Sequence, residues 1–362
     1  MATASTVTSP TPMSPPLTIA KVDLQTFAAN ILVAANSSPE DAAIVAGVLV
    51  WADVRGRHPQ GVFRLNVLRQ LLTHGLITSP ASMKFTERAP AAHHLDAGNG
   101  FGQVAGILAV QKAVECAKRF GIGFVAVNQS NHYGAASYYC ALAADAGCIG
   151  ITTTNAAPKV APYGGTGPVL GTNPIAFGCP TTSGAPILVD FATAAIAGST
   201  IRHLQERGGR LPEGVALDAG GEPTTDPTAL VTGSLLPAAG AKGYGLGVMV
   251  EILSAIVSGA GMSHEVGSYY TELKRTVGGG QSFIAIDIDV LLPRDTFLMR
   301  VDHLINALKA SPLQAGFAEI LYPGEIRGRN AARYEADGIP LTEETVRLLA
   351  KLAAELDVAT PW

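Results

Sequence analysis

Between residues 102 and 154 two kinds of hydrophobic pattern alternate, and this alternation is the strongest constraint on the fold. Helical patterns at 102–120 and 134–146 alternate with apolar extended runs at 122–127 and 149–154. Further extended runs follow at 174–177, 186–191 and 282–290. Helices that alternate with buried strands are typical of a sheet covered by helices. The sequence therefore predicts an α/β fold for the central part of the chain.

Both ends of the chain have helical patterns instead. Helices are predicted there from about Val22, at 39–54 and 64–73, and later at 295–309 and 342–356, and one more helix is predicted in the central part at 199–207. Ser38 and Thr342 are typical N-caps, and the apolar run 245–262 predicts a buried helix because it is shorter than the ~20 residues of a membrane span. We expect a disordered tail over 1–17, a helical lobe over 18–75 plus 295–358, and a central α/β lobe over 76–294.

Composition excludes several classes of protein. The net charge is −4 and the sequence has no run of Lys and Arg, so a nucleic-acid-binding surface is not expected. The four cysteines form no CxxC pair and the N-terminus has no signal-peptide pattern, so we expect a cytoplasmic protein without disulfides or a membrane span. No histidine spacing matches a zinc motif, and no metal cofactor is expected.

A glycine fingerprint for a dinucleotide is formally present but lacks its context. Residues 100–105 fit GxGxxA at the start of a helix. The preceding residues 93–96, HHLD, are too polar and too few for the buried strand that a Rossmann unit requires. We therefore interpret the glycines as a plain turn before a helix and expect a non-Rossmann fold.

Polar residues 128–134, NQSNHYG, follow an apolar strand, where α/β sheets hold their ligands. His132 in this segment can exchange a proton near neutral pH, because an unperturbed imidazole has a pKa of ~6.5. The alternative is a capping or core histidine. The loop 55–64 carries three arginines that can bind a carboxylate, with a solvated basic loop as the alternative.

A phosphate could approach the backbone N–H groups of two glycine-rich segments, 161–165 and 170–174. It could also approach the side chain of Lys242, in the segment 242–246. Ordinary turns are the alternative for each glycine segment.

Taken together, these segments resemble the type 2 malate/L-lactate dehydrogenase family, which includes ureidoglycolate and sulfolactate dehydrogenases and piperideine- and pyrroline-carboxylate reductases. The similarity spans about Ala52 to Gly338. It is carried by residues 52–56, 130–135, 154–155 with 161–165, 171–174, 188–193, 212–218, 242–246 with Glu251, and 323–325. The resemblance implies a non-Rossmann fold that binds NAD or NADP in the central lobe, in a homodimer.

The resemblance also implies roles for individual residues. His132 is similar to the family's proton acceptor or donor, and Arg64 to the arginine that binds the substrate carboxylate. Substrate contacts are implied for Gln60, Asn155 and Ala156. Cofactor contacts are implied for Asp190, Phe191, Ala192, Asn173, Lys242, Pro323, Gly324 and Glu325.

This chain departs from the family pattern at two places near the implied substrate. Pro59 and Gln60 replace the family's Ser-His pair, and Ala156 stands where many relatives have serine. Gln60 can donate and accept hydrogen bonds but cannot titrate. We expect an NAD(P)-dependent dehydrogenase of a small 2-hydroxy or 2-keto acid with altered specificity. The alternatives are a cyclic 2-imino acid reductase and a catalytically silent nicotinamide-binding relative.

Overall fold

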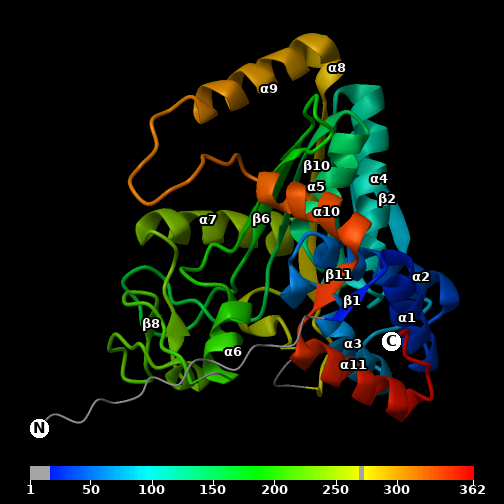
Figure 1. Cartoon of the computed structure of the whole chain (residues 1–362), viewed down its shortest axis with the longest axis vertical. Coiled ribbons are helices and arrows are strands. Elements are labelled where there is room, and N and C mark those ends of the chain that lie inside the picture. The colour runs from blue at the N-terminus through cyan, green and yellow to red at the C-terminus, as the bar shows by residue number, and fades with distance from the viewer. Residues whose placement is uncertain (1–16, 207, 269–272) are drawn as a thin grey trace, which may run out of the picture.

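The structure is a computed structural model that describes residues 17–206, 208–268 and 273–362. At its centre lies a seven-stranded mixed sheet in the order β2-β3-β4-β10-β5-β6-β7 (Figure 1). The strands are β2 (Lys84–Ala89), β3 (Ala92–Asp96), β4 (Ile122–Ser130), β5 (Cys148–Thr154), β6 (Ile175–Cys179), β7 (Ile187–Phe191) and β10 (Gly279–Asp287). The β3–β4 pair is parallel and the other neighbouring pairs are antiparallel. The predicted mixed α/β class is confirmed.

Residues 92–96 form the strand β3, where the sequence predicted no buried strand, and only Leu95 of this strand is buried. β3 pairs in parallel with β4, with Ala92 opposite Phe124 and Asp96 opposite Asn128. A strand between two neighbours satisfies its backbone through the ladder whatever its side chains are. The nearby glycine at 102 serves close packing, because a Cβ there would lie 2.1 Å from the carbonyl oxygen of Asn131.

Helices α4 (Gly102–Phe120) and α5 (Ala136–Asp145) pack on the sheet through small side chains. Ala109, Ala113 and Ala143 share a buried cluster with Tyr139 and Phe283. Small residues allow the helices to approach the strands closely, which explains the high alanine and glycine content. This packing places the first turn of α5 beside the ends of the central strands.

The prediction of a buried helix over 245–262 is wrong. α7 (Ala241–Glu251) continues into the π-helical turn η4 (Ile252–Ile256), and then the helix ends. Met249, Ile252 and Ile256 are 38%, 44% and 56% exposed. Val250 and Ala255 are buried. An apolar run cannot reveal that only one of its faces is covered.

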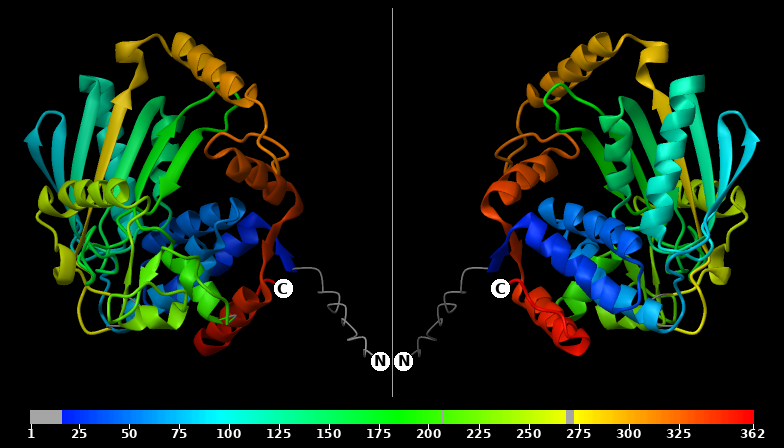
Figure 2. Two further views of the ribbon diagram at one scale, coloured as in Figure 1. Left: turned by 90° about the vertical axis from the view of Figure 1, so that its left-hand side faces the viewer. Right: turned by 90° about the vertical axis from the view of Figure 1, so that its right-hand side faces the viewer.

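Segments from both chain ends share a second core. α1 (Lys21–Ala34), α2 (Pro39–Val54) and α3 (Leu65–Thr73) pack with α11 (Glu343–Leu356), and Figure 2 shows these blue and red helices in the same half of the molecule. β1 (Leu17–Ile19) pairs antiparallel with β11 (Ile339–Leu341). Leu17 therefore belongs to a strand and not to the predicted tail, of which residues 1–16 lie outside the described residues.

Most of the remaining elements lie outside these two cores. The remaining elements are η1 (His58–Gln60), η2 (Val62–Arg64), α6 (Gly198–Glu206), β8 (Ala216–Leu217), η3 (Pro227–Val231), β9 (Ser234–Leu235), η5 (Ser263–Glu265), α8 (Ile288–Leu291), α9 (Arg294–Lys309) and α10 (Glu325–Asp337). Of these, α6, β8 and β9 contribute to a third buried cluster. α10 was not predicted, because its sequence EIRGRNAARYEAD has too few apolar residues to mark a buried face. Within the described residues, no helix has both the length and the hydropathy to cross a bilayer.

Candidate active site

A cavity of about 450 Å³ lies where the central sheet, the first turn of α5 and the loop after α2 meet. Of the residues predicted from the sequence, it is lined by Gln60, Arg64, His132, Asn155, Ala156, Asp190, Phe191 and Ala192. His132 and Arg64 lie 68 positions apart in the sequence and face the same space. The structure therefore brings the candidate proton-transfer group and the candidate carboxylate-binding group together.

The loop after α2 is held by a buried carboxylate. Asp53 is 1% exposed, and its Oδ2 accepts the backbone N–H of Val62 at 2.7 Å. Its Oδ1 lies 3.0 Å from Nδ1 of His58. Burial raises the pKa of Asp53 above its usual value, against the opposing effect of these two bonds. Gly61 is required here, because a Cβ would lie 2.1–2.2 Å from the Asp53 carboxyl atoms.

This anchored loop positions Arg64 at the cavity. The Arg64 side chain is 6% exposed, and its Nε donates to the carbonyl oxygen of Pro59 at 2.7 Å. Gln60 also lines the cavity, and its buried Oε1 has no hydrogen-bond partner among the described residues. The loop thus presents a guanidinium and an amide from one fixed segment.

His132 lies in the turn between β4 and α5, and its backbone is held from two sides. Asn131 donates through Nδ2 to the carbonyl oxygen of Gly100 at 2.8 Å, and Gln281 donates to that of Asn131 at 2.9 Å. The imidazole Nδ1 accepts the N–H of Gly134 at 3.2 Å. Gly134 has φ of +86°, which favours glycine. This contact orients the ring, so that Nε2 is the nitrogen on the side opposite Gly134.

Asn155 lines the cavity, but its amide is used to hold the fold. Its Nδ2 donates to Glu251 at 3.2 Å and to the carbonyl oxygen of Gly261 at 2.9 Å. Its Oδ1 accepts the N–H of Gly280 at 2.9 Å. Both ends of the side chain are therefore occupied, which argues against the predicted substrate contact through this amide.

Asn173 has a related supporting position and does not line the cavity. It is fully buried, and its Nδ2 donates to the same Glu251 carboxylate at 2.6 Å. Its Oδ1 accepts the N–H of Ala156 at 3.3 Å. Glu251 thereby links the two asparagines. Asn173 does not touch the cavity itself but holds the backbone of Ala156, which lines it.

Asp190, at the end of β7, is engaged by groups from two other elements. Its Oδ2 accepts the N–H and the hydroxyl of Ser137 at 3.0 and 2.7 Å, in the first turn of α5. It also accepts a bond from Nη1 of Arg57, and the Asp190 side chain is 8% exposed. This ion pair joins the loop after α2 to the sheet edge.

The turn at Pro323 and Gly324 lies beside the same strand, although it does not line the cavity. The carbonyl oxygen of Pro323 accepts the N–H of Leu188 at 2.9 Å, two residues before Asp190. Gly324 has φ of +95°, and a Cβ there would lie 2.8 Å from the Leu188 nitrogen. The turn therefore continues the edge of the sheet away from the cavity.

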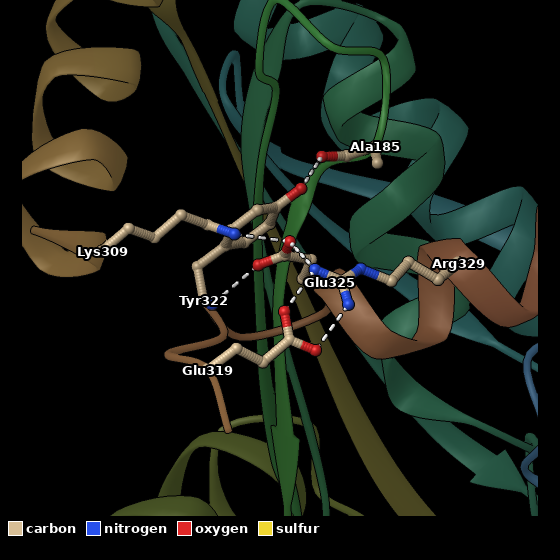
Figure 3. Close-up of polar contacts among 6 residues, drawn as sticks. All are labelled: Ala185, Lys309, Glu319, Tyr322, Glu325 and Arg329. Carbon is tan, nitrogen blue, oxygen red and sulfur yellow. Dashed lines mark hydrogen bonds and ion pairs between the residues drawn. The ribbon is translucent and has the colours of Figure 1, made fainter. Parts of the chain in front are cut away.

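Glu325 is bound by the protein's own cations (Figure 3). Its Oε1 accepts bonds from Lys309 at 2.6 Å and Arg329 at 2.7 Å, and its Oε2 accepts the N–H of Tyr322 at 3.2 Å. Although burial raises it, the pKa of Glu325 lies below its usual value because of these partners. The carboxylate fastens α9 and α10 together, so its described contacts are structural.

Lys242 is exposed in the first turn of α7 and does not line the cavity. Among the described residues, no group of three or more His, Cys, Asp or Glu side chains is placed to hold a metal ion.

Sequence reasoning missed several residues that build the site. Asp53, Ser137 and Gln281 were not singled out, and Arg57 was named only as part of a basic loop. A weak signal existed for Asp53, a charged residue in the last turn of the apolar helix α2, just before the basic loop. Ser137 and Gln281 act through partners distant in the sequence, and no local pattern marks such contacts.

Comparison with solved structures places this architecture among known dehydrogenases. Malate dehydrogenase from Entamoeba histolytica superimposes with a TM-score of 0.91 at 29% identity, over 96% of this chain and all of that one. L-sulfolactate dehydrogenase from Methanothermobacter thermautotrophicus is 36% identical over 329 residues, 91% of this chain and 94% of that protein. A pyrroline- and piperideine-2-carboxylate reductase from Pseudomonas syringae pv. tomato is 32% identical, over 94% of this chain and 97% of that protein.

A sequence profile described as malate/L-lactate dehydrogenase matches residues 19–350. The chain therefore belongs to the malate/L-lactate dehydrogenase family, as the motifs predicted, and it is an oxidoreductase.

Proposed function

We propose that the protein is an NAD(P)-dependent dehydrogenase that interconverts a small 2-hydroxy acid and its 2-keto acid. The observation that carries this proposal is the shared cavity of His132 and Arg64. A carboxylate beside a reacting carbon needs a cation, and the adjacent hydroxyl needs a proton acceptor. The relatives with malate and sulfolactate as substrates support the same reaction class.

The residues present fit a nicotinamide ring and its carboxamide. Two buried side-chain oxygens that border the cavity, Gln60 Oε1 and Asn131 Oδ1, have no hydrogen-bond partner among the described residues. A buried acceptor without a donor costs about 1–3 kcal/mol, and a carboxamide supplies two N–H donors. Small residues such as Ala135, Ala157 and Ala192 leave apolar wall for a planar ring. When bound, the coenzyme accepts or supplies the hydride.

The chain's own groups then have distinct tasks. Arg64 binds the substrate carboxylate with two parallel hydrogen bonds and so fixes the adjacent carbon. His132 takes the hydroxyl proton during oxidation and returns it during reduction. Asp53 holds the Arg64 loop in place, since it bonds the N–H of Val62.

Reduction of a cyclic 2-imino acid is the second candidate, and one observation favours it. The unpartnered Oε1 of Gln60 can accept an N–H from a cyclic amine product, which a titrating imidazole at that position would not do in its protonated form. The Pseudomonas syringae relative supports this alternative. A catalytically silent, nicotinamide-binding protein is the outcome if no acid is turned over.

The coenzyme's remaining half is proposed to run along β7, from Asp190, Phe191 and Ala192 toward the turn at 323–325. This path is supported by the bond between Pro323 and Leu188. Asn173 and Glu325 enter this proposal as supports of the walls, since their side chains are bonded within the protein. Lys242 on α7 lies outside the cavity and enters this proposal as a contact of the part of the coenzyme that extends beyond it.

The organisation into lobes, the homodimer and the cytoplasmic location are also proposals. The core shared by α1, α2, α3 and α11 supports a helical lobe made from both chain ends. Exposed apolar residues on α7 and α9, including Met249 and Met299, support a covered face in a dimer. Size-exclusion chromatography with light scattering tests the dimer.

The decisive experiment compares His132→Gln with wild type. We expect kcat to fall by ~10²–10⁴, the usual contribution of general acid–base catalysis, while NADH or NADPH binding measured by fluorescence persists. His74→Gln is the matched control, because His74 is exposed at the end of α3 and lies outside the cavity. The substrates are pyruvate, oxaloacetate and pyrroline-2-carboxylate, each with both coenzymes. Unchanged turnover in His132→Gln contradicts the assignment.

A further inference from the structure

Two arginines from distant parts of the chain meet beside Asp190. Arg57, in the loop after α2, donates through Nη1 to Asp190 Oδ2 and to the hydroxyl of Ser137 at 2.9 Å. Arg327, in the first turn of α10, donates through Nη1 to the carbonyl oxygen of Gly56 at 3.0 Å. Since Gly56 directly precedes Arg57, both side chains lie against the same short segment.

The charges of these two side chains act on each other. Burial lowers the pKa of Arg327 below its usual value, and the charge of Arg57 lowers it further, against the attraction of Asp190. The dipole of α10 also opposes a cation in the first turn of the helix. Two cations therefore share the carboxylate of Asp190, and an anion bound between them would relieve their repulsion.

Both guanidiniums keep donors for such an anion. Within the described residues, Nε and Nη2 of Arg57 make no hydrogen bond, and the same is true of Nε and Nη2 of Arg327. The Arg57 side chain is 21% exposed and lines the cavity, whereas Arg327 is exposed and does not line it. The pair therefore reaches from the cavity wall to the protein surface.

The proposed path of the coenzyme passes this pair. The path runs along β7 from Asp190 to the turn at Pro323, and Arg327 follows that turn at the start of α10. In nucleotide-binding α/β proteins a carboxylate binds a ribose 2′-hydroxyl, whereas a 2′-phosphate needs a nearby cation. Asp190 alone would repel such a phosphate. With Arg57 bonded to it and Arg327 beside it, the local charge is positive.

We propose that Arg57 and Arg327 bind the 2′-phosphate on the adenosine ribose of the coenzyme, so that the protein prefers NADPH to NADH. This inference rests on the proposed function and extends it to the choice of coenzyme. Nε and Nη2 of each guanidinium lie in the fork arrangement that binds two oxygens of one phosphate in parallel. NADH lacks this phosphate and leaves the two cations without a bound anion.

The pyrophosphate of the coenzyme is another anion that this pair could bind. NADH and NADPH both carry it, so a role there changes the affinity for both coenzymes equally. A purely structural role, in which Arg327 holds the loop after α2 through Gly56, also affects both equally. The ratio of the two dissociation constants therefore isolates the 2′-phosphate.

The test measures Kd for NADPH and for NADH by fluorescence titration in the absence of any acid substrate. We expect wild type to bind NADPH at least about tenfold more tightly than NADH. Arg327→Met should reduce this preference about tenfold, the lower end for a hydrogen bond to a charged group, because Arg327 is exposed. Arg327→Glu should reverse the preference, since a carboxylate accepts the 2′-hydroxyl and repels a phosphate. Arg57→Lys keeps a charge beside Asp190 but loses the fork, and a decrease of about 3–10-fold is expected.

The matched control is Arg347→Met, which removes one positive charge from an exposed site on α11 and should leave the ratio unchanged. Competition by 2′,5′-ADP and by 5′-AMP provides a second measurement, because neither compound contains a pyrophosphate. Arg327→Met should weaken the binding of 2′,5′-ADP and leave that of 5′-AMP as it is.

The inference is supported if the preference for NADPH is lost in Arg327→Met while NADH binds as it does to wild type. It is overturned if wild type binds NADH as tightly as NADPH, or if the ratio in Arg327→Met or in Arg57→Lys equals that of wild type. Equal losses for both coenzymes also overturn it and assign the pair to the pyrophosphate or to the support of the loop. If wild type binds neither coenzyme, the proposed function itself fails, which is a different result.

Discussion

Replacement of Gly61 by alanine tests how the loop after α2 controls the site. The new Cβ would lie 2.1–2.2 Å from the carboxyl atoms of Asp53, whereas carbon and oxygen need more than about 3 Å. Asp53 is 1% exposed and bonded to Val62 and His58, so it has no space into which to move. The loop itself must shift by about 1 Å. A shift of this size costs ~10²-fold in rate, and the overpacking costs about 1–3 kcal/mol of stability.

The assay is steady-state NADH oxidation with the best 2-oxo acid, combined with urea unfolding. We expect kcat/KM for Gly61→Ala to fall about 100-fold, because the shifted loop carries Arg64, which binds the acid, and Gln60, which borders the nicotinamide. Gly245→Ala is the matched control, since its Cβ would meet nothing within 4 Å in an exposed turn of α7. It should keep full activity and be slightly more stable. Wild-type activity in Gly61→Ala would refute the role assigned to this loop.

Two further substitutions test the supports of the site. Glu251→Ala removes the acceptor shared by Asn155 and Asn173. Each buried amide donor left without an acceptor should cost about 1–3 kcal/mol in urea unfolding, and a total loss under 1 kcal/mol would contradict this network. Glu325→Gln should cost about 1–2 kcal/mol at pH 7. Since the pKa of Glu325 is lowered in the folded state, its stabilisation is present above the unfolded pKa of ~4.3 and disappears as the pH falls through the lower folded value. The difference in Tm between wild type and variant should therefore narrow in acid, and a constant difference would exclude this linkage.

The central strands and the placement of His132 could be predicted from the sequence because they depend on local patterns. Polar residues directly after an apolar strand lie at the sheet edge, and His132, two residues after the end of β4, follows this rule. Arg64 and Asp190 were predicted only through the family resemblance, since the approach of the loop after α2 to the sheet is a long-range property. The pairing of β3 with β2 and β4, and the burial of only one face of α7, also depend on residues distant in the sequence.

The asparagines show a second limit of predicting a binding site from the sequence. The family resemblance implies a substrate contact for Asn155, and Asn155 does border the cavity. Its hydrogen bonds are nevertheless taken by Glu251 and Gly280, which lie about a hundred residues away or more. Whether a buried amide binds a ligand or the fold is decided by such partners, and spacing in the sequence does not reveal them.

A crystal structure of the complex with NADH and oxamate, a non-reactive analogue of a 2-keto acid, tests the convergence of His132 and Arg64 most directly. The account predicts the oxamate carboxylate within ~2.7–3.1 Å of the Arg64 guanidinium, with its adjacent carbonyl oxygen at the same distance from His132 Nε2. Oxamate bound away from either side chain, or a nicotinamide ring outside the cavity, would contradict it.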